Sequence, residues 1–540
     1  MAMDMEKLVA LCRRRGFIFQ SSEIYGGING FWDYGPLGVE LKRNIKEAWW
    51  NDMVRNPPLG PDGQEIDMVG VDCALIMNPK VWVASGHAGG FADEMVDCKK
   101  CRKRFRADKV FLVAVTDGTS EAPILLLAYE ANDPVEAGKL AQPDVDRLIK
   151  KKKLPAGAVV RAGNSASAAP AAWKRVCPVA DCDGELTEPR KFNLMFETYV
   201  GAVRDEENIA YLRPETAQGI FVNFKNVLDS TRLKLPFGIA QVGKAFRNEI
   251  NPRNYTFRSR EFEQMEIEFF CKPEESMKWY QWWRNQRIAW YSQLGIKSDK
   301  LRPREQGKEE LAHYSIGTTD IEYMFPFAEE PQELEGVAHR GDFDLSAHAK
   351  HSGKDLSYFD EEGWNALLTK ALEPFKEDKK RADEEKKKLM QSDRPKFQYV
   401  PHVIEPSAGA DRFTLAVLCE AYCEDTVGGE ARTVMRLHPR LAPIKAAILP
   451  LVNKEGMPEK AQALYRELKQ DWNVFYDDGG AIGRRYRRMD EAGTPFCVTI
   501  DGDTLKDGTV TIRERDSCVQ RRVPYNSVAD EIRKALRPQR

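Results

Sequence analysis

The sequence lacks any long apolar run. No stretch of about 18 apolar residues occurs in its 540 residues, so no membrane-spanning helix is expected. The short apolar start at 8–11 is followed by Arg13, Arg14 and Arg15, which a secretory signal would not tolerate. A cytoplasmic protein is therefore expected.

An excess of charge of one sign is also missing. The 81 lysines and arginines balance 83 aspartates and glutamates, which gives a formal net charge of -2. This balance argues against a chain that binds nucleic acid indiscriminately, so any RNA contact must come from local patches. The length exceeds that of one ordinary domain, and two or three domains are expected.

Cysteines are too few and too scattered for a disulfide framework. There are eleven, an odd number, and reduced thiols are the better interpretation. Cys98 and Cys101 form one close pair, and Cys177 and Cys182 form a second. Four thiolates would suit a tetrahedral structural zinc. The pairs are about 75 residues apart, so either an insertion brings them together at its ends or they are unrelated.

The phosphate-binding loop G-x-x-x-x-G-K-[ST] is absent, so a nucleotide would need a different kind of site. Residues 237–270 instead predict a long antiparallel hairpin, because two segments of period two flank an Asn-Pro-Arg-Asn loop. On the first strand, Gln241, Ala245, Arg247 and Glu249 would share one face. On the second strand, Gln264, Glu266 and Glu268 would share one, so the hairpin would have a polar face. Such a face is either solvated sheet surface or the wall of a ligand site.

A strand, a small-residue turn and a helix are predicted over 402–422. Arg412 would lie in the first turn of that helix. Backbone N–H groups and the macrodipole attract anions to a helix N-terminus, and a guanidinium adds a fixed charge with several donors. The arrangement suits a terminal phosphate.

These two elements resemble motifs 2 and 3 of the class II aminoacyl-tRNA synthetases. Motif 2 would be Phe246-Arg247-Asn248-Glu249 with Phe262, and motif 3 Gly409-Ala410-Asp411-Arg412. The helix that begins at Pro36 resembles motif 1, the dimerisation element. Four further segments resemble the dimeric glycyl enzymes of this class: Ser85-Gly86-His87, residues 213–219 (RPETAQG), residues 261–266 (EFEQME) and Glu405-Pro406-Ser407.

The resemblance implies an enzyme that activates glycine with ATP and Mg²⁺ and transfers it to the 3' end of its tRNA. Arg247 would bind the α-phosphate and Arg412 the γ-phosphate, and these two are the expected catalytic residues. Glu333 would help to hold the magnesium ion. The ATP site implied by the family comprises Arg247, Asn248, Glu249, Phe257, Arg258, Ser259, Arg260, Glu261, Phe262, Glu333, Leu334, Gly409, Ala410, Asp411 and Arg412.

Glycine has no side chain to grip, so its ammonium and carboxylate must be recognised and larger substrates excluded. Glu215 and Glu266 resemble the ammonium-binding carboxylates, and Ser407 lies where a larger substrate would clash. Glu215 could equally be an acid that stabilises a helix N-terminus after Pro214. The expected glycine site comprises Arg106, Glu215, Phe262, Glu263, Gln264, Met265, Glu266, Glu405, Pro406, Ser407, Ala408 and Gly409.

The resemblance places four segments along the chain. Residues 1–106 and 176–436 would form an α+β catalytic domain on an antiparallel sheet flanked by helices, interrupted by an insertion at 107–175 with a flexible exit at 155–172. Lysines 150–153 in that insertion could touch the tRNA acceptor stem. Residues 437–540 would form an anticodon-binding α/β domain.

Two other charged segments leave alternatives open. The mixed run at 376–396 is either a solvated helix or an RNA contact. In the C-terminal part, Arg484, Arg485, Arg487 and Arg488 surround Tyr486, with Arg513 and Arg515 further on. They form either a solvated face or a surface that holds phosphates and stacks bases.

Two competing hypotheses remain at this point. A noncatalytic relative could keep the fold for RNA binding alone, although it could then have lost Arg247, Arg412 or the acidic pocket, all of which are present. An enzyme for serine, threonine, proline or alanine could use the same ATP site.

Overall fold

The computed structural model describes residues 4–118, 122–131, 133–161, 164–170, 173–312 and 315–537. It divides into two compact units, residues 1–85 with 197–540 and residues 86–196. In the described ranges no helix combines the length and the apolar composition that crossing a membrane requires.

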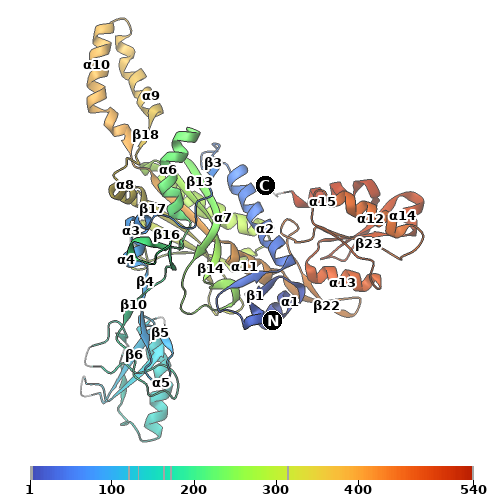
Figure 1. The fold of residues 1–540 in the computed structure, drawn as a ribbon, viewed down its shortest axis with the longest axis horizontal. Coiled ribbons are helices and arrows are strands. Elements are labelled where there is room, and N and C mark those ends of the chain that lie inside the picture. Colours follow the sequence, from blue (N-terminus) through green and yellow to red (C-terminus); the bar gives the residue numbers. More distant parts are fainter. Residues whose placement is uncertain are drawn as a thin grey trace. The chain divides into compact units, whose positions relative to one another are not determined.

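A seven-stranded sheet forms the centre of the first unit (Figure 1). Its strand order is β15 (Leu301–Glu305), β16 (Gly317–Tyr323), β17 (Gln332–Gly341), β20 (His402–Gly409), β14 (Glu261–Cys271), β13 (Phe237–Phe246) and β3 (Asp67–Gly70). All neighbours are antiparallel except β13 and β3. The expected antiparallel sheet and the hairpin at its centre are confirmed.

Helices cover both faces of this sheet. One face packs on α1 (Met5–Arg15), α2 (Pro36–Trp50), α7 (Ser276–Gln293) and α11 (Ala410–Ala421), and Met265, Ile267 and Phe269 of β14 point into that core. The other face packs on α6 (Ala217–Thr231) and α8 (Phe343–Ser352). Strand side chains alternate between the faces, so the polar row of β14 lies on the α6 side.

Residues 1–85 and 197–436 contain further helices and strands outside this sheet and the helices that cover it. They are β1 (Ile18–Gln20), β2 (Trp32–Tyr34), α3 (Pro79–Ala84), β11 (Glu197–Tyr199), β12 (Ile209–Tyr211), β18 (Tyr358–Phe359), α9 (Glu361–Leu372), α10 (Lys379–Ser392), β19 (Gln398–Tyr399), β21 (Tyr422–Val427) and β22 (Glu430–Met435). The charged run lies on α10, which pairs with α9 as a helical hairpin (Figure 1). Most of its side chains are exposed.

The C-terminal part of this unit has its own five-stranded sheet. The order is β24 (Val474–Tyr476), β23 (Ala446–Pro450), β25 (Phe496–Ile500), β26 (Thr509–Glu514) and β27 (Gln520–Pro524), parallel over the first three strands. Its helices are α12 (Met457–Leu468), α13 (Ile482–Ala492), α14 (Gly502–Asp507) and α15 (Val528–Leu536), and α12 and α15 pack on one apolar core. The predicted α/β domain is confirmed.

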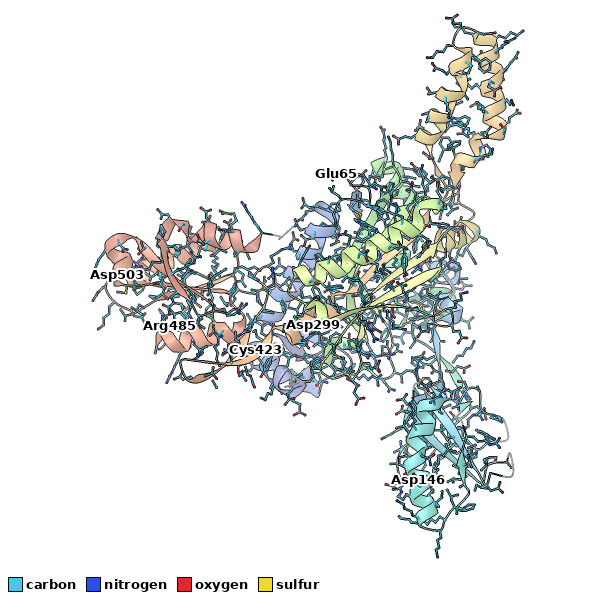
Figure 2. The ribbon with its side chains drawn as sticks, turned by 180° about the vertical axis from the view of Figure 1, so that it is seen from behind. Glu65, Asp146, Asp299, Cys423, Arg485 and Asp503 are labelled. Atoms are coloured by element: carbon cyan, nitrogen blue, oxygen red, sulfur yellow. The ribbon has the colours of Figure 1, made fainter. Side chains whose placement is uncertain are left out.

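The second unit is wider than the expected insertion at 107–175. It contains α4 (His87–Gly90), β4 (Ala92–Asp97), β5 (Arg104–Arg106), β6 (Val110–Thr116), β7 (Leu125–Glu130), α5 (Pro134–Lys150), β8 (Val159–Val160), β9 (Asn164–Ser165) and β10 (Arg190–Asn193). Figure 2 marks Asp146 of α5 in this unit. In the expected flexible exit, β8 and β9 instead pair with β6, while residues 162, 163, 171 and 172 lie outside the described residues.

Candidate active site

The two elements singled out from the sequence meet at adjacent strands. β14 pairs with β20, so Gln264 lies opposite Gly409 and Glu266 opposite Ser407. β20 passes directly into α11 without the expected turn, because Gly409 is the N-cap and Ala410 begins the helix. Arg412 therefore emerges in the first turn, as predicted, beside the polar row of the hairpin.

A pocket of about 170 Å³ lies between these elements. Its lining combines residues of the hairpin, β17, β20 and α11. They are Arg247, Glu249, Thr256, Phe257, Arg258, Ser259, Phe262, Gln264, Glu333, Leu334, Gly336, Ser407, Gly409, Asp411 and Arg412. The pocket thus gathers thirteen of the residues expected at the ATP site or the glycine site, together with Thr256 and Gly336.

Two arginines bring positive charge to the pocket. Arg247 Nε donates to the Pro214 carbonyl oxygen at 3.0 Å, and its guanidinium lies 5.4 Å from the ring centre of Phe262. Arg412 Nε donates to the Phe257 carbonyl oxygen at 3.2 Å, and its guanidinium lies 4.7 Å from the Phe257 ring centre. Aromatic faces and carbonyls hold both cations in defined orientations, which is how preorganised anion-binding groups act.

One carboxylate accompanies Arg412. Glu333 Oε2 lies 3.2 Å from Arg412 Nη1, and the Glu333 side chain is half exposed. The Arg412 charge holds the pKa of Glu333 below its usual range. Glu333 therefore offers an ionised carboxylate at the pocket wall, and carboxylate oxygens are the groups that Mg²⁺ prefers.

The hairpin loop forms the other wall. Arg258 Nε donates to Glu249 Oε2 at 2.8 Å, and Arg260 Nε donates to the Glu249 carbonyl oxygen at 2.8 Å. Phe257 makes edge contacts with Phe325 and Phe327. These contacts hold the hairpin loop beside Phe262 and Glu249, which both line the pocket.

Several carboxyl groups lie near Ser407, which lines the pocket. Glu266 is buried and accepts hydrogen bonds from Ser407 Oγ at 2.7 Å, from Gln264 Nε2 at 3.4 Å and from Thr216 Oγ1. Burial raises the pKa of Glu266, and the neighbouring Glu215 adds to the shift. Neighbouring carboxyl groups that repel each other in this way favour a bound cation such as an ammonium group.

A buried polar chain connects Glu215 with Glu405. Gln218 Nε2 donates to Glu215 Oε1 at 2.9 Å and to Asp344 Oδ1 at 3.0 Å. Arg340 donates to Asp344 Oδ2 at 2.7 Å and to Glu405 Oε2 at 2.7 Å. All five residues are buried, so each polar contact carries more free energy than it would in water.

Gln218 also has a fixed orientation. His348 Nε2 lies 2.7 Å from Gln218 Oε1, and the Gln218 amide nitrogen already donates, so the histidine is the donor. Burial lowers the pKa of His348, which keeps its ring neutral. Gln218, Arg340, Asp344 and His348 were not predicted as site residues. Only Gln218 had a sequence signal, because it lies within the 213–219 segment.

Arg213 anchors the same segment to the hairpin. Its guanidinium donates to the carbonyl oxygens of Lys244 at 2.7 Å and Cys73 at 2.8 Å. A Cβ at Gly243 would lie 2.2 Å from Arg213 Nη2, so only glycine leaves room for this side chain. Glu215 is thereby held two residues from a buried, immobile cation.

Several residues expected at the glycine site point elsewhere. The carboxylate of Glu263 pairs with Lys42 at 2.7 Å and Lys46 at 2.8 Å of α2, and Met265 is buried in the opposite core. Strand alternation is the reason, because only even-numbered positions of β14 face the pocket. Ile404 and Ala408 of β20 likewise face the core, which puts the Pro406 side chain on that face too. Four side chains expected at the glycine site therefore point away from the pocket. They belong to Glu263, Met265, Pro406 and Ala408.

Some residues expected at the ATP site mainly hold the elements around the pocket, although Asp411 is also one of its lining residues. Asp411 accepts from Tyr34 at 2.5 Å, from Lys42 at 2.8 Å and from the Glu263 N–H at 2.7 Å. Ala410 is buried in the core, and Glu261 pairs with Lys244. Asn248 is not among the described residues that line the pocket.

Arg106 belongs to the second unit. It lies on β5, and its guanidinium lies 2.8 Å from Asp108 Oδ2 and 3.4 Å from Asp93 Oδ2. Its assignment to the glycine site stays a prediction.

The four cysteines of the second unit do converge. Their sulfurs all lie within 4.8 Å of one another, with Cys98 Sγ 3.7 Å from Cys182 Sγ and Cys101 Sγ 3.7 Å from Cys177 Sγ. A Zn–S bond of about 2.3 Å implies an S–S edge of about 3.8 Å in a tetrahedron. Gly184 leaves the space, because a Cβ there would lie 2.4 Å from Cys98 Sγ. The donor set and its size fit zinc.

Three of the arginines expected on the surface of the C-terminal domain are buried instead. Arg485, marked in Figure 2, is buried and donates to the carbonyl oxygens of Pro450 and Asp477. Arg513 is buried against Asp490 at 2.8 Å, and Arg515 is buried and donates to the Gly493 carbonyl oxygen at 2.9 Å. These guanidiniums satisfy internal acceptors, whereas Arg484 is exposed.

Comparisons with known proteins agree with this geometry. A family model described as the tRNA synthetase class II core domain (G, H, P, S and T) matches residues 196–366, and one described as the anticodon binding domain matches residues 445–535. The chain is 52% identical over 552 residues to a glycine–tRNA ligase of Rhodopirellula baltica, covering 99% of each chain. It is 47% identical to glycine–tRNA ligases of Lachnospira eligens, covering 97% of each chain, and of Clostridium perfringens, covering 98% of each chain.

Proposed function

The chain belongs to the glycine–tRNA ligases, a family with the class II synthetase core, and we propose from this how its pocket divides between ATP and glycine. The enzyme activates glycine with ATP and transfers it to the 3' end of its tRNA. One observation carries the proposal: two oriented arginines line one pocket, and Ser407 of the same lining donates to Glu266, a member of a cluster of buried carboxyls.

In the first step a glycine carboxylate oxygen attacks the α-phosphorus of ATP. A new O–P bond forms, the bond to the β-phosphate oxygen breaks, and pyrophosphate leaves with the electron pair. Two anions must approach each other, so the protein's task is to neutralise charge rather than to supply a nucleophile. Arg247 lies beside the acidic end and would stabilise the charge that grows on the α-phosphate.

Arg412 would bind the γ-phosphate. Its position in the first turn of α11 adds the N–H groups of that helix terminus to the guanidinium. Glu333 beside it would help to hold Mg²⁺, which would supply positive charge against the phosphates when bound. Phe262 would stack on the adenine, and Glu249, fixed by Arg258, would accept from its amino group.

Glycine would lie at the Ser407 end of the pocket. Its ammonium group would contact Glu215 and Glu266, and these carboxyls would also orient its carboxylate toward Arg247. Ser407 donates to Glu266 and would occupy the space that a larger side chain needs. Exclusion by packing is the selectivity available for a substrate without a side chain.

In the second step a 3'-terminal ribose hydroxyl of tRNA attacks the carbonyl carbon of glycyl-adenylate. The ester bond forms, AMP leaves, and the hydroxyl proton is released. The C-terminal domain belongs to the anticodon-binding class and would hold the opposite end of the tRNA. Exposed Arg484 and the lysines at 150–153 are the proposed phosphate contacts.

A homodimer through α2 is the proposed assembly. α2 has the motif 1 likeness, and Lys42 on it lies 2.8 Å from Asp411 and 2.7 Å from Glu263. These pairs join the helix to α11 and to β14. A partner that orders α2 would therefore stabilise both sides of the ATP site.

A structural zinc on Cys98, Cys101, Cys177 and Cys182 is proposed for the second unit. The metal would link the end of β4 to the segment around Gly184. It would thereby stabilise a domain whose apolar cores are small. Structural zinc contributes directly to folding.

Amino-acid-dependent exchange of pyrophosphate into ATP tests the proposal. The purified protein would be assayed with glycine, alanine, serine, threonine and proline, and the Arg247→Ala variant would be assayed in parallel. Exchange with glycine alone, lost in the variant, is expected. Exchange with no amino acid would favour an RNA-binding relative without catalysis, and a different preferred amino acid would overturn the pocket assignment.

A further inference from the structure

Glu268 is the one member of the polar row of β14 that no substrate role explains. Its side chain is 0% exposed, and neither carboxyl oxygen has a hydrogen-bond partner among the described residues. Oxygens of Glu266, Glu268 and Glu405 all lie within 4.8 Å of one another. An isolated ionised carboxylate in such a place would cost many kcal/mol, so this arrangement needs a proton or a cation.

The groups that face Glu268 are mostly acids. β14 contributes Glu266, β20 contributes Glu405 and α8 contributes Asp344, whereas Arg340 of β17 is the cation among them. Arg340 is already shared between Asp344 and Glu405. One guanidinium cannot neutralise four buried carboxyls, and the excess negative charge is reduced most simply by protonation.

Hydrogen-bond donors show which carboxyl takes the proton. Donors stabilise the ionised form. Glu266 accepts from Ser407, Gln264 and Thr216, whereas Glu405 and Asp344 accept from Arg340. Glu268 accepts from none of the described groups. Burial raises the pKa of Glu268 well above its usual range, and the charge of Glu405 adds to the shift. Burial raises the pKa of Glu405 as well, but Arg340, which donates to it, opposes that shift.

We propose that Glu268 is a neutral carboxylic acid whose proton is donated to Glu405, and that it acts as a positioning residue for the acidic end of the pocket. Glu405 then has Arg340 on one side and Glu268 on the other. Glu268 does not touch the substrate in this arrangement. It removes one negative charge from the cluster, so that the ionised carboxyls left for the glycine ammonium are those at the pocket wall.

This inference rests on the proposed glycine site for its consequence, but the protonation state can be measured without it. Infrared difference spectra of the wild type against Glu268→Gln should contain the carbonyl-stretch band of a protonated carboxylic acid, present at neutral pH. Glu305→Gln, at a partly exposed carboxyl on β15 paired with Arg284, is the matched control and should leave that band unchanged. Absence of the band in the wild type would overturn the proposal, whatever the activity.

Kinetics of pyrophosphate exchange test the positioning role. Glutamine has the shape and a donor group of the neutral acid, so Glu268→Gln should keep the KM for glycine within about threefold of the wild type. Glu268→Leu cannot donate and should raise it about tenfold or more, which corresponds to about 1.4 kcal/mol for a lost buried hydrogen bond, with the KM for ATP unchanged. A cluster that held a divalent cation would lose glycine binding in Glu268→Gln as well, and that result would contradict the proposal. Melting temperatures of all variants show whether a leucine effect reflects misfolding.

Discussion

Ser407 donates its hydroxyl hydrogen to Glu266 Oε1 at 2.7 Å on the neighbouring strand, so one residue both lines the pocket and orients a buried carboxyl. Ser407→Gly should remove both functions and Ser407→Ala only the hydrogen bond. We expect Ser407→Gly to reduce the glycine-to-alanine ratio of kcat/KM by about 10 to 200-fold, the range for one methylene of pocket space. Ser407→Ala should keep most of the discrimination. Equal discrimination in all three proteins would show that Ser407 does not set the pocket size.

Arg247 is expected to act mainly in the chemical step. Arg247→Ala should lower kcat of pyrophosphate exchange by about 10²- to 10³-fold, the usual effect of removing one preorganised donor to a growing charge. Single-turnover formation of the adenylate measures this step directly. Arg436→Ala is the control, because Arg436 is exposed, pairs with Asp425 of β21 and is not a lining residue of the pocket. A variant that changed only the KM for ATP would assign Arg247 to ground-state binding.

Lys42 joins α2 to the site through two nearly buried ion pairs. Lys42→Met would leave Asp411 and Glu263 without their main cation, and such a break costs about 3 to 5 kcal/mol. A lower melting temperature and weaker exchange activity are expected together. Lys7→Met, which removes an exposed pair with Glu424, should change neither.

The stability effect of Lys42 should depend on pH. Burial alone would raise the pKa of Glu263, but Lys42 and Lys46 outweigh it and hold the pKa below its usual range. A carboxyl with a depressed pKa contributes stability above its unfolded pKa, about 4.3, and loses it as the pH falls through the folded value. The difference in melting temperature between wild type and Lys42→Met should therefore narrow as the pH is lowered from 7 to below 4. A constant difference over that range would argue against an ionic origin.

Zinc content tests the cysteine cluster. The wild-type protein should contain about one zinc per chain by elemental analysis, and Cys98→Ser should contain much less, because a closed structural site uses all four ligands. Limited proteolysis should then cut within residues 86–196 faster. Cys423→Ser is the control, since Cys423 lies on β21 outside the cluster. Full zinc content in Cys98→Ser would show that the metal, if present, binds elsewhere.

Local patterns predicted the elements that carry the site. The period-two segments gave β13 and β14, and the strand before α11 brought Arg412 into the first turn as expected. Strand parity alone could also have removed Glu263 and Met265 from the glycine site. The error there came from including a continuous segment where only alternate residues share a face.

Long-range polar pairing could not be predicted in this way. Gln218 and Asp344 are 126 positions apart, and nothing in either local sequence indicates that they meet. Arg340 and Asp344 are four positions apart, which is the spacing of neighbours on one face of a helix. Here, however, Arg340 lies at the end of strand β17 and Asp344 at the start of helix α8. Buried networks of this kind are determined by which faces the tertiary fold brings together.

Two neighbouring arginines of the basic helix α13 have different roles, although the sequence pattern treated them alike. Arg485 is buried and donates to three backbone carbonyls, whereas its neighbour Arg484 is exposed. Arg485→Ala should leave buried acceptors unpaired, each costing about 1 to 3 kcal/mol, and lower the melting temperature. Arg484→Ala should leave stability unchanged and weaken tRNA binding, with a smaller dependence of the Kd on salt because one phosphate contact is lost. If Arg484→Ala bound tRNA with the wild-type Kd and salt dependence, the exposed face of α13 would not contact the RNA, and the tRNA would have to be held by other strands or loops of this domain.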